Sequence, residues 1–342
     1  MTQTTPFTIA QLTQTVAGIF AAAGVTPAGS AALADVIVHA ERDACKSHGV
    51  YRIEGCLRTI KAGKTRPDSV PRQVDGSGAI IRIDAQGGFS PVAFRHGLPA
   101  LVERTRELGL AALVINDCTH FSALWHEVEA LTAQGLAGLA MCPSYATVAP
   151  TGGLRPLLGT NPLAFGWPRA GTNPYVFDFA TSMAARGEIE LHRRAGTPLP
   201  AGWALDADGL PTTDPQAALN GAMLPFGGHK GSAISTMIEL LAGAMIGDFL
   251  SPEALDWLGT TSLAPRHGEL ILAFDPARFA AGRGDPLAHA ETLFTDIVGQ
   301  GARLPSQRRF DARARALTDG IVLDAAEVAL LDRLQRDGLA AV

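Results

Sequence analysis

Residues 163–179 read LAFGWPRAGTNPYVFDF, and this stretch decides the fold class. Leu163–Trp167 and Val176–Phe179 have the apolar and aromatic character of β-strands. No helix separates these two strands, so we expect them to pair antiparallel, because parallel neighbours need a long crossover connection. The sequence therefore predicts an α/β protein that is not doubly wound.

Outside this stretch, helices and strands are mixed without regular alternation. Apolar spacing predicts helices at Ile9–Ala23 (with Thr8 as N-cap), Gly29–Asp43, 48–62, Val92–Glu107, Trp125–Gln134, His229–Ile246, Leu287–Val298 and Ala325–Asp337. Apolar, β-branched runs predict further strands at Ala79–Ala85, Ala111–Asn116, Ala137–Cys142 and Glu269–Phe274. Pro198–Pro215 is rich in chain breakers and is predicted to be a long functional loop.

Length, composition and charge exclude several classes of protein. The 342 residues favour roughly two domains. A formal net charge of −5 offers no basic field for a nucleic acid. The longest apolar candidate, Ile234–Leu250, is interrupted by polar residues and is shorter than a membrane-spanning helix. Because the first basic residue is Arg42, the apolar N-terminus lacks the charged start of a signal peptide.

The four cysteines show no C-x-x-C spacing, so they indicate neither a disulfide framework nor a metal site. We expect reduced thiols in a cytoplasmic protein. The common nucleotide and hydrolase motifs are also missing. No G-x-G-x-x-G follows a strand, and there is no P-loop, H-E-x-x-H or G-x-S-x-G. Any activity must therefore depend on less familiar sites.

The first candidate site is Ser47-His48-Gly49-Val50-Tyr51-Arg52. If these residues open a helix, His48 and Arg52 lie four residues apart on one face. An imidazole that exchanges a proton would then stand beside a guanidinium that holds a carboxylate. The alternative is a helix N-terminus with Ser47 as its cap and an exposed charged face.

The second candidate is Leu224-Pro225-Phe226-Gly227-Gly228-His229-Lys230-Gly231, at the start of an apolar helix. Backbone N–H groups, the helix dipole and Lys230 would there bind an anion such as phosphate. The alternative is a glycine-rich turn with a solvated lysine. Three weaker candidates place small, polar or aromatic residues at strand ends, and they are 159–162, 177–182 and 120–125.

Taken together, four of these motifs resemble the malate/L-lactate dehydrogenase family of the second type. They are Ser-His-Gly-x-x-Arg near 50, Gly-Thr-Asn-Pro near 160, Asp-x-Ala-Thr-Ser near 180 and Pro-x-Gly-Gly-His-Lys-Gly near 228. The resemblance implies a non-Rossmann, nicotinamide-binding α/β fold with a mixed, largely antiparallel sheet and a helical second domain. It also implies a substrate-binding and dimerisation domain at 1–115 and 296–342, and an NAD(P)H-binding domain at 116–295.

The resemblance also implies roles for individual residues. His48 would be the proton donor, Ser47 and Glu188 its relay, Arg52 the carboxylate ligand, and Thr160 a second substrate contact. The cofactor would be NADPH, with NADH possible. The residues implied to bind it are His120, Phe121, Ser122, Ala123, Leu124, Asp178, Phe179, Ala180, His229, Lys230, Arg303, Arg308 and Arg309. No metal is implied.

Within the family, His-Phe-Ser-Ala-Leu-Trp at 120–125 and the loop at 224–231 are most similar to reductases of Δ1-piperideine-2-carboxylate and Δ1-pyrroline-2-carboxylate. The implied reaction is NADPH-dependent reduction of these cyclic imino acids to L-pipecolate and L-proline, in a cytoplasmic homodimer. One alternative is a dehydrogenase of a 2-hydroxy acid such as malate, lactate or ureidoglycolate. Another is a non-catalytic protein that binds phosphate or nucleotides.

Overall fold

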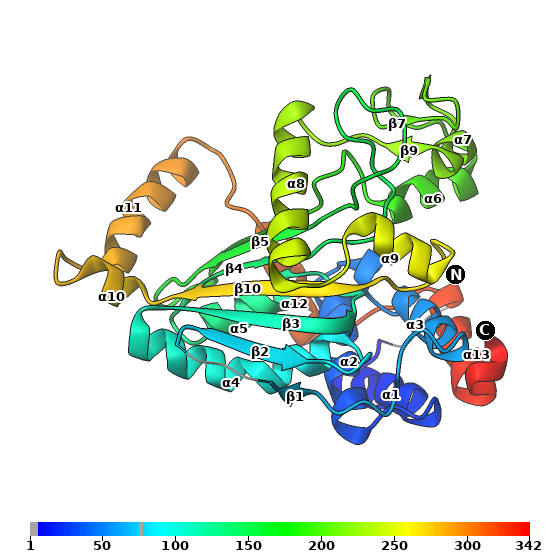
Figure 1. The fold of residues 1–342 in the computed structure, drawn as a ribbon. Helices are drawn as coiled ribbons and strands as arrows, with labels where there is room; N and C mark the ends of the chain where they lie inside the picture. Colours follow the sequence, from blue (N-terminus) through cyan, green and yellow to red (C-terminus); the bar gives the residue numbers. More distant parts are fainter. Residues whose placement is uncertain (1–5, 75–77) are drawn as a thin grey trace.

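The computed structural model describes residues 6–74 and 78–342. A seven-stranded sheet with the order β1-β2-β3-β10-β4-β5-β6 forms its centre (Figure 1). These strands are Arg72–Gln73 (β1), Ile80–Asp84 (β2), Leu110–Thr119 (β3), Ala137–Met141 (β4), Leu163–Trp167 (β5), Tyr175–Phe179 (β6) and Arg266–Phe274 (β10). Among the described strands of this sheet, β2 and β3 pair parallel and the other pairs are antiparallel. β5 and β6 form the expected antiparallel pair, so the prediction of a mixed, largely antiparallel sheet is confirmed.

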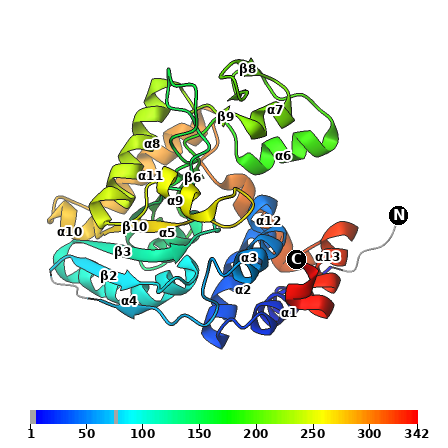
Figure 2. The ribbon, with the colours of Figure 1, turned by 45° about the vertical axis from the view of Figure 1, so that its right-hand side comes forward.

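Helices cover both faces of this sheet. Ser90–Leu108 (α4) and Trp125–Thr132 (α5) pack on one face, and His229–Ala242 (α8) and Ser251–Leu258 (α9) on the other (Figures 1 and 2). α4 ends one residue beyond the predicted Glu107, because Gly109 adopts the left-handed conformation that glycine tolerates best (φ 90°). Two apolar layers result, one between the sheet and α4–α5 and one between the sheet and α8.

A separate helical core joins the two ends of the chain. It contains Ile9–Ala22 (α1), Pro27–Arg42 (α2), Tyr51–Lys61 (α3) and Ala325–Asp337 (α13) (Figure 2). Phe7 and Ile321 form an antiparallel bridge that ties the N-terminal segment to the C-terminal one. Thr8 caps α1 as predicted, in a reciprocal capping box with Gln11.

A small lobe with its own core rises above the sheet. It contains Arg186–Ala195 (α6), Pro215–Asn220 (α7) and a second sheet of Ala204–Leu205 (β7), Pro211–Thr212 (β8) and Ala222–Met223 (β9) (Figure 2). The predicted loop Pro198–Pro215 therefore contains two short strands. Their two-residue length leaves no alternating pattern from which a strand can be predicted.

The remaining helices connect these parts. Lys46–His48 (η1) precedes α3, Ala244–Ile246 (η2) follows α8, and Gly338–Ala341 (η3) ends the chain. Pro276–Ala280 (α10) and Pro286–Gly299 (α11) project from the sheet as an arm, and Gln307–Asp319 (α12) returns the chain to the helical core (Figure 1). No single helix among the described residues is long and apolar enough to cross a membrane, although one pair bent by 71° passes by length and composition.

The predicted domain boundary between residues 115 and 116 falls inside β3. β2, most of α4 and the first half of β3 pack in the sheet core together with α5 and β4, while Val92 of α4 packs against the helical core. The reason is the parallel β2–β3 pair, which binds residues 80–84 into the sheet. The division into two domains stays a prediction; α13 packs against α1, so the two ends of the chain share the helical core.

Candidate active site

A cavity of about 1330 Å³ opens between the helical core, the sheet and the small lobe. Residues of η1 and α3 form one wall, and the segment after β3 and the ends of β4 and β6 form the floor and the opposite wall. The start of α6 and the segments 261–265 and 303–309 complete it. The volume exceeds the range of about 300–1,000 Å³ that is usual for a small-ligand pocket. It therefore leaves room for a large ligand and a small one together.

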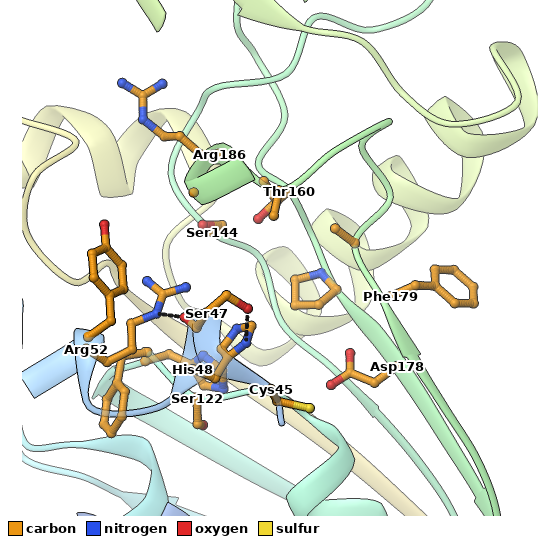
Figure 3. Close-up of a pocket in the computed structure, with 18 of the residues that line it drawn as sticks. Cys45, Ser47, His48, Arg52, Ser122, Ser144, Thr160, Asp178, Phe179 and Arg186 are labelled. Atoms are coloured by element: carbon orange, nitrogen blue, oxygen red, sulfur yellow. Dashed lines mark hydrogen bonds between the residues drawn. The ribbon is translucent and has the colours of Figure 1, made fainter. Parts of the chain in front are cut away.

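Ser47, His48 and Arg52 lie together on the helical wall (Figure 3). Ser47 Oγ is 3.1 Å from His48 Nδ1, and Arg52 Nε donates to the Ser47 carbonyl at 2.7 Å. The expected shared helix is wrong, because η1 ends at His48 and α3 starts only at Tyr51. Gly49 lies between the two helices. A larger residue does not fit at this position, because its Cβ would lie 1.8 Å from the buried Glu41 carboxylate. The carbonyl of Ser47 nevertheless brings Arg52 beside His48.

Desolvation at the cavity wall, aided by the positive charge of Arg52, lowers the pKa of His48 to about 3. The imidazole is therefore neutral near pH 7. Ser47 contacts Nδ1, so Nε2 is the nitrogen left for a ligand. Likewise Arg52 donates through Nε to the Ser47 carbonyl, and its two terminal nitrogens have no hydrogen-bond partner among the described residues, so they stay available for a carboxylate.

Thr160 lines the cavity opposite this wall (Figure 3). Its carbonyl accepts from the Thr181 backbone N–H at 2.8 Å, which joins the start of β5 to the end of β6. The next residue, Asn161, is fully buried and donates through Nδ2 to Glu239 Oε1 at 2.7 Å. This buried anchor fixes the loop that presents Thr160.

The predicted cofactor loop follows β3. His120, Phe121, Ser122 and Ala123 line the cavity, whereas Leu124 is fully buried in the sheet core. Asp178 receives a hydrogen bond from the Trp125 N–H at 2.9 Å and so caps α5 at the end of this loop. Burial raises the pKa of Asp178 to about 6. Ala180 and Phe179 line the cavity beside it, with the Phe179 ring turned away from His48 (Figure 3).

The arginines of the C-terminal segment differ in what they contact. Arg303 and Arg308 are exposed cations on the cavity wall. Arg309 is buried, pairs with Asp43 at 2.9 Å and with Glu129, and stacks 4.3 Å above the Trp125 ring. Because its guanidinium already has these partners, we now expect Arg309 to hold the segment in place and Arg303 and Arg308 to face a ligand.

His229 and Lys230 are exposed at the N-terminus of α8 and lie outside the residues that line the cavity. Gly227 and Gly228 both have positive φ, and no described side chain caps this helix. Phe226 packs edge-on against Phe179 at the cavity rim, so the free N–H groups of α8 lie next to the cavity. This cradle fits an anionic group of a ligand that extends beyond the rim.

Glu188 lies on the exposed side of α6. It is not among the described residues that line the cavity, and no described hydrogen bond or ion pair joins it to His48. Its relay role stays a prediction that this arrangement does not favour.

Sequence reasoning missed several residues of the cavity. Tyr145 is half-buried and donates to the Thr261 carbonyl at 3.0 Å, Arg186 donates to Thr261 Oγ1, and Cys142 and His267 line the floor. All four cysteines are free thiols, as expected from their spacing. The visible signal in the sequence was that His267 and Glu269 directly precede the apolar run 270–274 of β10.

Known proteins resemble this chain over its whole length. The model for malate/L-lactate dehydrogenases matches residues 7–332. A Δ1-pyrroline-2-carboxylate reductase of Agrobacterium fabrum is 69% identical and covers 100% of both chains. A Δ1-pyrroline-2-carboxylate/Δ1-piperideine-2-carboxylate reductase of Pseudomonas aeruginosa is 57% identical over 85% of this chain and 88% of its own. The crystal structure of Δ1-piperideine-2-carboxylate reductase from Pseudomonas syringae has a TM-score of 0.92 at 41% identity and covers 97% of this chain and 100% of its own.

Fold, cavity and relatives together define an oxidoreductase that uses a nicotinamide cofactor on a non-Rossmann fold. The chain belongs to the malate/L-lactate dehydrogenase family.

Proposed function

We propose that this protein reduces cyclic imines that carry a 2-carboxylate, namely Δ1-pyrroline-2-carboxylate to L-proline and Δ1-piperideine-2-carboxylate to L-pipecolate, with NADPH. The observation that carries the proposal is the position of Arg52 beside His48 on a cavity with room for a cofactor. The relatives named above, which are reductases of these two imines, support the choice of substrate.

The geometry supports a division of labour. The terminal nitrogens of Arg52 bind the carboxylate, which places the ring C=N bond toward His48. When Ser47 donates to Nδ1, the imidazole proton stands on Nε2 and can hydrogen-bond the ring nitrogen. A bound reduced nicotinamide would supply a hydride to the imine carbon. Thr160, on the opposite wall of the cavity, contacts the other side of the substrate ring.

We propose that the cofactor lies along the loop 120–123 and the end of β6, with its phosphates toward the uncapped start of α8 and Lys230. Arg303 and Arg308 would favour NADPH over NADH, because the extra phosphate needs a cation. Neither arginine takes part in an ion pair or a side-chain hydrogen bond within the described residues.

The test is NADPH oxidation with both imines, with pyruvate and oxaloacetate as comparison substrates. The imines should turn over far faster than the oxo acids. Oxo acids that outrun both imines would instead identify a hydroxy-acid dehydrogenase. His48→Ala should lower kcat by about 10²–10⁴-fold, the usual range for a general acid. An unchanged kcat in that variant removes His48 from its role.

We further propose a cytoplasmic homodimer. Free thiols fit a reducing compartment. The arm exposes Phe279, Leu293 and Val298, and α11 buries only Phe294, which stacks on Tyr175. Such an apolar surface is typical of an interface between subunits. Light scattering should give the mass of two chains, and Leu293→Glu should give one; a monomeric unaltered protein contradicts the proposal.

A further inference from the structure

Two carboxyl groups lie beneath the cavity without hydrogen-bond partners. Glu127 on α5 and Glu269 on β10 are both 0% exposed. Within residues 6–74 and 78–342, none of their four carboxyl oxygens has a hydrogen-bond partner. An isolated buried carboxylate is very unfavourable, so the two groups cannot both be ionised. This pair, which we call the floor carboxyls, requires an explanation.

The charges that face the floor carboxyls give them no cationic partner. No described ion pair joins either group to a lysine or arginine. Burial raises the pKa of Glu269 to about 8 and that of Glu127 well above its ordinary value, the latter also through the charge of Glu269. The other ionisable groups facing this cluster from the surrounding elements are Cys118, His120, His126, Cys142, Asp178 and His267. The floor carboxyls therefore hold protons at neutral pH.

His120 connects these carboxyls to the cavity. Its side chain is 5% exposed and lines the cavity, yet its Nε2 is enclosed and unpaired, 4.0 Å from Glu269 Oε2. Ligand-type atoms of His120, Glu127 and Glu269 all lie within 4.8 Å of one another. One water molecule between them would complete a hydrogen-bonded chain. On the cavity side, the positive charge of Arg52 acts on His120.

The proposed reaction creates a need for such a chain. Reduction of C=N adds a hydride to carbon, and the π electron pair moves to nitrogen, which takes up one proton. His48 is neutral near pH 7, so it can give its Nε2 proton to the substrate only if another group supplies a proton in its place. We propose that Glu269 and Glu127 store one proton beneath the cavity and that His120 passes it toward the substrate nitrogen beside His48. Glu269 is here a positioning and proton-supplying residue that acts through His120.

The number of protons that the floor carboxyls lose and regain is equal over one turnover. The floor carboxyls lose one proton to the amine nitrogen and become a singly charged pair. They regain one proton from solvent through the opened cavity once the product has left. The inference rests on the proposed imine reduction, because only a reaction that consumes a proton uses this store.

The test is the pH profile of kcat and KM for Glu269→Gln, with Glu269→Asp as the matched control. Glutamine keeps the neutral, hydrogen-bonding shape of a protonated carboxyl but cannot release the proton. We expect kcat at pH 8 to fall at least tenfold in Glu269→Gln, the imine KM to stay within twofold, and the alkaline limb to move to lower pH. Glu269→Asp should restore much of kcat. Glu127→Gln provides the second variant if the first fails to fold.

A kcat profile of Glu269→Gln that overlays that of the unaltered enzyme overturns the proton store. A stoichiometric metal ion in the unaltered enzyme that disappears in Glu269→Gln overturns it as well, because His120 and the carboxyls would then be ligands. If the unaltered enzyme reduces neither imine, the proposed function has failed instead, and the two failures are thus distinguishable.

Discussion

Asp43 and the floor carboxyls are all buried acids, and their surroundings are opposite. Asp43, at the end of α2, is surrounded by three guanidiniums: Arg42 at 2.7 Å, Arg309 at 2.9 Å, and Arg313. The floor carboxyls have no guanidinium partner in the described part of the chain. The arginines hold the pKa of Asp43 below its ordinary value against the effect of burial, whereas burial alone raises that of Glu269 to about 8. Buried acids thus serve structure where they are paired, and can store protons where they are not.

The largest effect should come from breaking the paired group. Asp43→Asn leaves Arg309 and Arg313 partly buried with only Glu129 as a charged partner. We expect the free energy of unfolding to fall by about 3 kcal/mol, the lower end of the range for a broken buried pair. Urea unfolding at pH 7 measures it. Asp337→Asn, which removes an exposed partner of Arg336, is the control and should change little.

The sign of the pH dependence sharpens this first prediction. The pKa of Asp43 is lowered in the folded state, so its stabilisation is present above the unfolded pKa and is lost as pH falls through the folded one. The difference between the unaltered protein and Asp43→Asn should therefore shrink in acid. A difference that stays constant down to pH 3 would show that charge pairing is not its cause.

The floor carboxyls should give the opposite pH dependence. Glu269 has a pKa of about 8 when folded, against an ordinary value of 4.5, so between these values the folded state binds more protons than the unfolded one. Stability then falls as pH rises, by up to about 1.4 kcal/mol per pH unit for one proton. Glu269→Gln removes this slope. Unfolding free energies of both proteins at pH 5, 6.5 and 8 measure it, and parallel curves would contradict the raised pKa.

The contrast between the two groups also shows what a sequence can reveal. β5 and β6 were predictable because their short separation leaves only an antiparallel pairing. The first-turn cap of α1 and the glycine end of α4 were predictable for the same local reason. α12 was missed because its first half is arginine-rich, and Arg309 meets Asp43 across 266 residues of chain. Such partners are set by tertiary packing, which local propensity does not record.

The same reasoning applies to the candidate site. The neighbourhood of His48 and Arg52 followed from a short motif, although the expected continuous helix was wrong. The floor carboxyls come from a helix and a strand that are far apart in the chain. Neither segment contains a sequence pattern that indicates contact with the other. Only the apolar surroundings of Glu269 in β10 hinted that its carboxyl is buried.

The last prediction compares two arginines of one segment, of which one is paired with buried acids and the other is not. Arg308 and Arg309 are neighbours, but only Arg309 is bound to Asp43 and Glu129. Arg308→Gln should raise the KM for NADPH about tenfold, as expected for one charged hydrogen bond, with unfolding free energy unchanged. Arg309→Gln should lower the unfolding free energy by about 1–3 kcal/mol through the loss of its buried partners. Steady-state kinetics with NADPH and NADH, together with urea unfolding, distinguish the two. If Arg308→Gln loses stability and Arg309→Gln loses only NADPH affinity, the paired and free roles of these arginines are exchanged.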